Sequence, residues 1–288
     1  MQGLLIAASK ANHVSYDYAV TSANCTVEIV KLIISFVALT QVWRAEGITE
    51  DNRLSSSWDE LHVYPIPAAL YLVKNLLQYY IFYWTTAPSY QVLKNLNIIS
   101  TGVLYRMFLR RKLSGVQWAA LVLLGLGCTV AQLDTGSDAV LSTPVVGLLV
   151  AIVMALLSGA AGVYTELIMK KRQQRNVNVQ NFYLYAFGIF FNAVAIWLYD
   201  YDAVAGRGYF HGYTVLVCVM IANHALSGIA VSLVMKFADN IVKVYSTSVA
   251  MILTTLVSIP LFGFELTLPF VLGTAVVSVA VYLHYQSK

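Results

Sequence analysis

The sequence has few charged residues. Only 11% of its 288 residues are Asp, Glu, Lys or Arg, whereas 59% are hydrophobic. A chain of this composition cannot bury so much apolar surface in one water-soluble core and still present a wettable exterior. Lipid must therefore cover much of the surface. The composition excludes a soluble enzyme or a soluble binding domain and predicts a membrane protein.

Cysteine and histidine are also scarce, and their spacing is wrong for metal or redox chemistry. Cys25, Cys128 and Cys218 lie far apart within apolar stretches, so neither a disulfide framework nor a thiolate metal site is predicted. The five histidines show no metal-ligand spacing and no HExxH motif. They are His13, His62, His211, His224 and His284. We therefore expect no catalytic residue, no metal site and no cofactor.

What the sequence has instead is a series of apolar stretches of about 20 residues, the length that spans a bilayer as a helix. They lie near residues 19–42, 61–84, 89–109, 115–133, 145–169, 181–199, 213–235, 241–262 and 268–285. The predicted fold is an all-α polytopic membrane helical bundle that forms a single membrane domain. The apolar segment 3–8 is too short to span, so we expect a ten-helix plan whose first helix is largely missing from this chain.

Basic residues are unevenly distributed among the predicted loops. If the loops alternate between two sides, one side collects Arg44, Arg53, Arg106, Arg110, Arg111, Lys112, Lys170, Lys171, Arg172, Arg175, Lys236 and Lys288. The other side has only Lys10 and Arg207, among acidic residues. The positive-inside rule makes the first side, with the C-terminus, cytoplasmic. Two five-helix halves, residues 1–136 and 137–288, then have opposite orientations, which is the inverted-repeat plan of many carriers.

Charged residues within the predicted spans are the main functional signal, because an ionisable side chain at the centre of a span costs about 2.5 to 3.5 kcal/mol. Glu28 and Lys31 are three residues apart on one helix, where they can neutralise each other or position a substrate. Lys74 and Lys94 have no acidic neighbour in their own helices. Lys243 opens a later span, where its side chain can also extend to the membrane interface.

Asparagine and tyrosine accompany these lysines at helical spacing, so that they are expected to share helix faces. The sets are Tyr90, Lys94, Asn97 and Thr101 in one helix, Asn75, Gln78 and Tyr79 in another, and Asn181 and Tyr185 in a third. Buried asparagines also serve as hydrogen-bonding glue between helices. Together with lysines from both halves, they favour an anion-binding cavity. Gly159 and Gly162 allow close helix packing and can also leave room for a ligand.

Four sequence motifs resemble those of the nucleotide-sugar transporters in the drug/metabolite transporter superfamily. They are VEIVKL at residues 27–32, YQVLKNLNIISTG at 90–102, SGAAGVYTE at 158–166 and DNIVKVYS at 239–246. The resemblance covers about residues 18–285 and is greatest with the plant branch of the CMP-sialic acid transporters.

This resemblance implies a Golgi antiporter that exchanges CMP-sialic acid, or a related CMP-linked acidic sugar, for CMP. It implies that the nucleotide cavity is lined by Asn75, Tyr90, Gln91, Asn181, Tyr185 and Lys243, and that Glu28 and Lys31 correspond to a residue pair of the family's second helix. We add Lys74, Lys94, Asn97, Gly159, Gly162 and Ser246 to the predicted substrate-binding set.

One position departs from the family pattern. Many animal members have a lysine at the position of Asn97, whereas in this chain the lysine stands three residues earlier, at Lys94. On a continuous helix, three residues displace the charge by about 4.5 Å. Because a flexible lysine side chain covers most of that distance, we predict that Lys94 makes the phosphate contact.

Three other functions compete with this prediction. A UDP-sugar transporter that carries UDP-galactose or UDP-GlcNAc in exchange for UMP is the alternative within the family, because the motifs identify the family better than the base. A membrane-embedded enzyme would need a catalytic constellation that the sequence lacks. A scaffold or lipid-binding protein would not need lysines in three spans. We expect the lipid bilayer and nucleotides as partners, and no nucleic acid; an oligomer is compatible with the sequence.

Overall fold

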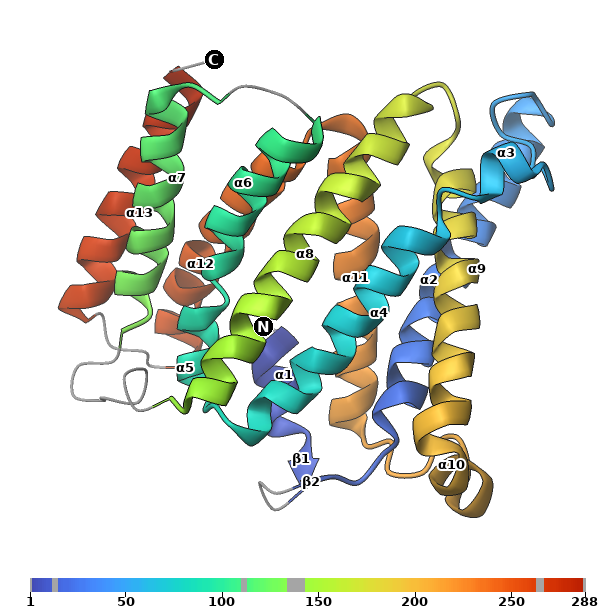
Figure 1. Ribbon diagram of the computed structural model, residues 1–288, viewed down its shortest axis with the longest axis horizontal. Coiled ribbons are helices and arrows are strands. Elements are labelled where there is room, and N and C mark those ends of the chain that lie inside the picture. Colours follow the sequence, from blue (N-terminus) through green and yellow to red (C-terminus); the bar gives the residue numbers. More distant parts are fainter. Residues whose placement is uncertain (1, 12–14, 110–112, 134–142, 263–266, 287–288) are drawn as a thin grey trace. The chain divides into compact units, whose positions relative to one another are not determined.

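The computed structural model describes residues 2–11, 15–109, 113–133, 143–262 and 267–286. Helices account for most of these residues, which confirms the all-α prediction (Figure 1). The described residues also form one short antiparallel ribbon, in which β1 (Lys10–Ala11) pairs with β2 (Ser15–Tyr16). The chain divides into two compact units. Unit 1 comprises Met1–Tyr83 and Tyr164–Phe237, and unit 2 comprises Trp84–Val163 and Ala238–Lys288.

Unit 1 is built around α2 (Val20–Glu46), which packs along α9 (Val177–Ala195) and α11 (Val215–Phe237). A fourth helix, α4 (Pro65–Tyr80), also packs along α9, and Figure 1 shows α2 and α9 running side by side. The remaining elements are α1 (Gln2–Ala8), α3 (Trp58–Leu61), η1 (Ile81–Tyr83), η2 (Ile196–Asp200), α10 (Tyr201–Arg207) and the C-terminal end of α8 (Val145–Lys171).

The first turn of α2 shows how local chemistry fixes a helix end. Asp200 Oδ2 accepts hydrogen bonds from the Thr21 hydroxyl at 2.5 Å and from the Thr21 amide at 3.3 Å. A carboxylate at this position satisfies an otherwise unpaired amide and complements the positive end of the helix dipole. The end of η2 is thereby attached to the start of α2 within unit 1.

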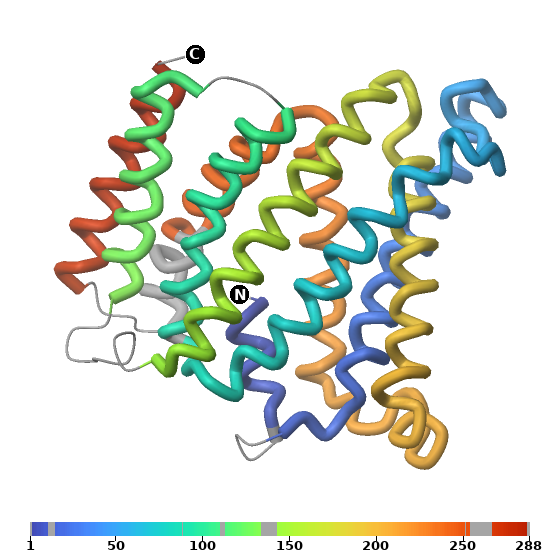
Figure 2. Tube along the Cα trace, in the orientation of Figure 1, coloured from blue at the N-terminus to red at the C-terminus, as the bar shows by residue number. Residues whose placement is uncertain are grey.

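Unit 2 contains α5 (Ala87–Leu93), α6 (Leu96–Leu109), α7 (Gly115–Ala131), α12 (Asn240–Phe262), α13 (Leu268–Gln286) and most of α8. The closest helix pair is α7 with α13, drawn in green and red in Figure 2. Two glycines permit this approach. A Cβ on Gly273 would overlap the backbone of Ala131, and a Cβ on Gly127 would lie 2.9 Å from the Val277 amide nitrogen.

Five helical segments of the described chain are long and apolar enough to cross a membrane. They are α2, α8, the continuous stretch Val177–Arg207, α11 and α13. The protein is therefore a multi-pass membrane protein, as predicted. Helices also occupy the other predicted stretches, and α7 is a shorter apolar helix of 17 residues. The inverted relation between residues 1–136 and 137–288 stays a prediction.

The prediction of one continuous helix over residues 89–109 is wrong. Helix α5 ends at Leu93 and α6 begins at Leu96, so Lys94 lies in the break. The amide of Asn95 bonds to the carbonyl three residues earlier, as does that of Asn97, which winds the chain more tightly than an α-helix. Asparagine side chains favour such departures because they compete with the backbone for hydrogen bonds. The straight-helix displacement of about 4.5 Å between positions 94 and 97 therefore does not apply.

The packing of α7 against α13 predicts a destabilised variant. Because a methyl group at Gly273 would meet backbone atoms that cannot rotate away, Gly273→Ala should destabilise the fold by about 1 to 3 kcal/mol. Thermal unfolding of the purified protein measures this loss. Gly125→Ala is the matched control, since the nearest atom to its Cβ is 3.9 Å away. Equal unfolding temperatures for Gly273→Ala and the native chain would contradict the close-packed pair.

Candidate functional site

Lys31 lies at the centre of a polar group in unit 1. Its Nζ is 2.6 Å from Glu28 Oε1 and 4.4 Å from the centre of the Tyr185 ring on α9. The carboxylate and the electron-rich face of the ring both stabilise the ammonium charge. The spacing of Glu28 and Lys31 left open an ion pair or a role in positioning a substrate, and the structure contains the ion pair.

Two glycines let neighbouring helices reach this ion pair. A Cβ on Gly188 of α9 would lie 2.8 Å from Glu28 Oε2, and a Cβ on Gly228 of α11 would lie 2.9 Å from Lys31 Cδ. Any larger residue at either position would have to displace a charged side chain. Neither glycine was expected from the sequence, because each contact joins helices that are far apart along the chain.

Asn181 and Tyr185 form a buried polar stripe on α9. Their side chains are 1% and 2% exposed. Asn181 Nδ2 donates a hydrogen bond to Ser232 Oγ of α11 at 2.8 Å, whereas Asn181 Oδ1 has no hydrogen-bond partner among the described residues. Buried polar atoms of this kind are costly unless a ligand or water satisfies them. Asn181 is therefore suited to binding a polar molecule.

Lys74 contacts polar neighbours on its own helix, α4. Its Nζ donates to Gln78 Oε1 at 2.6 Å and to Asn75 Oδ1 at 3.3 Å. His224 of α11, which the sequence did not single out, lies within electrostatic range of both Lys74 and Lys31. Unit 1 thus brings two predicted lysines and a histidine into one polar region.

Lys94 and Lys243 are neighbours in unit 2. They lie within electrostatic range of each other, and none of the ion pairs among the described residues includes either of them. Lys243 Nζ donates a hydrogen bond to the neutral side chain of Asn240, at 3.3 Å from its Oδ1. Because two nearby positive charges repel, this arrangement favours the binding of an anion.

The remaining predicted residues of unit 2 surround the break between α5 and α6 or belong to α12. Tyr90 is buried and Gln91 is half-buried on α5. Asn97 Oδ1 accepts a hydrogen bond from the Thr101 hydroxyl at 3.2 Å. Ser246 is exposed on α12, one turn beyond Lys243.

Gly159 and Gly162 of α8 face other helices of unit 2. A Cβ on Gly159 would lie 2.8 Å from Leu104 Cδ1 of α6, and a Cβ on Gly162 would lie 2.6 Å from Asn240 Oδ1 of α12. Both contacts fit the packing role that the sequence left open beside the ligand role. Asn240, which was not predicted, connects Gly162 to Lys243.

Lys236, at the end of α11, is a buried lysine whose environment differs from that of Lys243. Its Nζ donates to the carbonyl oxygens of Met169, Arg172 and Arg175 at 3.4, 3.0 and 2.8 Å, and to Gln180 Oε1 at 3.0 Å. The last turn of α8 and the turn that follows it supply these carbonyls. Lys236 therefore joins the ends of α8, α9 and α11 in unit 1. Its ammonium group has no N–H left to donate to a ligand.

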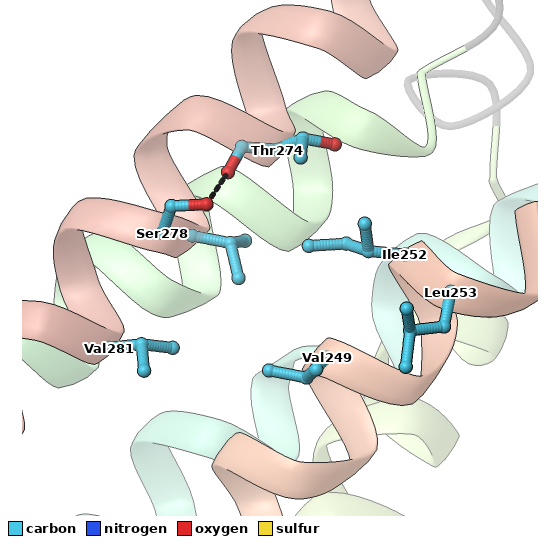
Figure 3. Close-up of a pocket in the computed structure, with 7 residues that line it drawn as sticks. Val249, Ile252, Leu253, Thr274, Ser278 and Val281 are labelled. Carbon is cyan, nitrogen blue, oxygen red and sulfur yellow. Dashed lines mark hydrogen bonds between the residues drawn. The ribbon is translucent and has the colours of Figure 1, made fainter. Parts of the chain in front are cut away.

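A hollow between α12 and α13 is not the candidate site. Figure 3 shows its lining, which includes Val249, Ile252, Leu253 and Val281. Ser278 Oγ also faces it but donates to the Thr274 carbonyl at 2.9 Å. The surface is almost entirely apolar and contains none of the predicted binding residues. Among the described residues, no group of three His, Cys, Asp or Glu side chains could hold a metal ion.

The predicted binding residues thus divide between the units. Unit 1 holds Glu28, Lys31, Lys74, Asn75, Asn181 and Tyr185, and unit 2 holds Tyr90, Gln91, Lys94, Asn97, Gly159, Gly162, Lys243 and Ser246.

A family model described as "Nucleotide-sugar transporter" matches residues 2–285. The chain belongs to the nucleotide-sugar transporter family. The family predicted from the four sequence motifs of this transporter is thereby confirmed.

Relatives of the transporter carry related names. CMP-sialic acid transporter 2 of Oryza sativa subsp. indica is 64% identical over all of this chain and 80% of its own length. CMP-sialic acid transporter 4 of Arabidopsis thaliana is 63% identical over all of this chain and 81% of its own. A probable UDP-sugar transporter of Xenopus tropicalis is 36% identical over 91% of this chain and 81% of its own.

A solved structure described only as "Crystal structure of protein" shares the fold of the transporter. Its TM-score is 0.60 at 14% identity, over 98% of this chain and 93% of the other.

The Glu28–Lys31 pair predicts an asymmetric response to substitution. Glu28→Gln leaves a buried ammonium without its carboxylate, so we expect it to destabilise the fold by about 3 kcal/mol or more. The double variant Glu28→Gln/Lys31→Met, which removes both charges, should lose less stability than Glu28→Gln. Thermal unfolding in detergent measures both. The control is Glu50→Gln, because the Glu50–Arg53 pair is exposed and contributes about 1 kcal/mol at most. A double variant less stable than Glu28→Gln would refute this account of the pair.

Proposed function

We propose that this transporter exchanges a CMP-linked acidic sugar, such as CMP-sialic acid, for CMP across the Golgi membrane, with its C-terminus in the cytoplasm. The observation that carries the proposal is the pair of neighbouring lysines, Lys94 and Lys243, which take part in no ion pair among the described residues. A nucleotide phosphate supplies the negative charge and the acceptor oxygens that two ammonium groups require.

The choice of CMP over UMP is supported by the relatives. Proteins named CMP-sialic acid transporters are 63% and 64% identical to this chain, whereas the UDP-sugar relative is 36% identical. A UDP-sugar transporter that exchanges UMP remains the second candidate, since a uracil and a cytosine differ only at one hydrogen-bonding edge and both nucleotides offer the same phosphate.

Unit 1 has a second set of polar residues that are suited to binding a polar molecule. Asn181 Oδ1 can bond to a base edge or ribose, because it is buried without a partner among the described residues. Lys31 can bind a second anionic group if that group replaces Glu28. Asn75 and Lys74 add donors on α4 of the same unit.

Exchange follows from the same electrostatics. With no ligand bound, Lys94 and Lys243 would have to pass through the transport cycle as two unneutralised charges, which is costly in a membrane protein. A bound nucleotide offsets them in either direction. We propose that the two halves, residues 1–136 and 137–288, are the repeats that alternate the access of the site.

Ligand-dependent stability tests the choice of nucleotide. We expect CMP to raise the unfolding temperature of the purified transporter more than UMP, UDP-galactose or GMP at equal concentration. A ligand at one hundred times its dissociation constant stabilises the folded state by about 2.7 kcal/mol. GMP serves as the control for non-specific effects of phosphate. A larger shift with UMP would overturn the CMP assignment in favour of the UDP-sugar function.

The break between α5 and α6 sharpens the prediction for Lys94. Because Asn97 Oδ1 already accepts a bond from Thr101, we expect Lys94→Ala to weaken CMP binding by about tenfold or more, while Asn97→Ala has the smaller effect. Both variants are tested for CMP binding and for uptake of labelled nucleotide-sugar into CMP-loaded vesicles. Normal transport by Lys94→Ala, with loss of transport in Asn97→Ala, would show that the phosphate contact has been assigned to the wrong residue.

A further inference from the structure

The N-terminal turn of α12 holds a neutral amide against the side chain of Lys243. Asp239 caps this helix, because its Oδ1 accepts a hydrogen bond from the Val242 amide at 2.7 Å. Asn240, the first residue of α12, is completely buried, and its Oδ1 accepts a bond from Lys243 Nζ at 3.3 Å. The carboxylate of Asp239 thus stabilises the helix backbone, and the ammonium of Lys243 contacts an uncharged acceptor.

Gly162 of α8 supplies the space that Asn240 occupies. A Cβ at position 162 would lie 2.6 Å from Asn240 Oδ1, 2.8 Å from its Nδ2 and 3.0 Å from its Cγ. Carbon atoms do not approach polar atoms so closely, so any residue other than glycine would displace the amide. The atoms in conflict belong to the end of a flexible side chain, and such a displacement costs the fold little.

We propose that Asn240 is a positioning residue for Lys243: its amide, lodged against Gly162, holds the ammonium at the start of α12 without neutralising it, so that the charge remains available to the substrate phosphate. This inference rests on the proposed function, in which Lys243 binds phosphate. The N-terminal end of α12 contributes in the same direction, because the positive end of a helix dipole also attracts an anion.

The neutrality of the amide is the feature that a substitution can test. Asn240→Asp keeps the shape of the side chain but puts a carboxylate where Lys243 donates its hydrogen bond. Lys243 supplies a positive charge at this position, and Lys94 lies within electrostatic range of Lys243. An ion pair with Lys243 would compete with the substrate phosphate, so affinity should fall while the packing against Gly162 is kept.

Binding of CMP to the full chain, measured against pH, gives a readout that a purely structural role of Asn240 would not produce. At neutral pH we expect Asn240→Asp to bind CMP about tenfold or more weakly than the native chain. The ratio of the two affinities should return towards one as the pH falls and the introduced carboxylate gains a proton. Native affinity of Asn240→Asp at neutral pH, or a loss that is independent of pH, would overturn the proposal.

A second set of variants tests the contact with Gly162 even if the introduced carboxylate impairs folding. Gly162→Ala and Asn240→Ala should each weaken CMP binding, and the double variant should bind no more weakly than Asn240→Ala, because both changes remove the same hydrogen bond. Gly125→Ala, on α7, is the control for an added methyl group. Additive losses in the double variant would refute the coupling.

Transport kinetics and one further variant separate this inference from the proposed function. In uptake assays, Gly162→Ala should raise the KM for nucleotide-sugar with little change in the maximal rate. Lys243→Met tests the phosphate assignment itself. If Lys243→Met binds CMP normally, the proposed role of Lys243 fails and the inference with it. If Lys243→Met loses CMP binding while Asn240→Asp and Gly162→Ala retain it, only the inference fails.

Discussion

Two positive charges, Lys94 and Lys243, repel each other within one unit of this multi-pass membrane protein. Among the described residues neither charge is neutralised by a carboxylate, and the neutral amide of Asn240 orients one of them. An anion with several acceptor oxygens satisfies both ammonium groups at once. In the proposed function, the charge of the substrate and the exchange both follow from this electrostatic condition.

Other lysines show how the same chain stabilises a positive charge when no ligand is needed. Lys31 pairs with Glu28 and lies over the Tyr185 ring. Lys236 donates to Gln180 Oε1 and to the carbonyls of Arg172 and Arg175, which follow the end of α8. Lys170 pairs with Glu166, four residues earlier on the same helix. Each of these lysines has local compensation for its charge. The contrast separates lysines that stabilise the fold from those suited to a substrate.

Much of the fold could be predicted from the sequence because apolar length is a local property, and helices occupy all nine predicted stretches. Family membership followed from short motifs, which are local too. The break at Lys94 was missed because the spacing of Tyr90, Lys94 and Asn97 fits a helix face equally well whether or not the backbone continues. The roles of Gly188 and Gly228 could not be predicted, because each depends on a side chain from another helix. Asn240 was missed for the same reason.

We propose that a bound nucleotide must accompany Lys94 and Lys243 through the transport cycle. The most direct measurement is the efflux of labelled CMP from vesicles that contain the purified transporter, with and without CMP outside. If the lysines require an anion, efflux should be fast with external CMP and much slower without it. Equal efflux rates under both conditions would contradict the account.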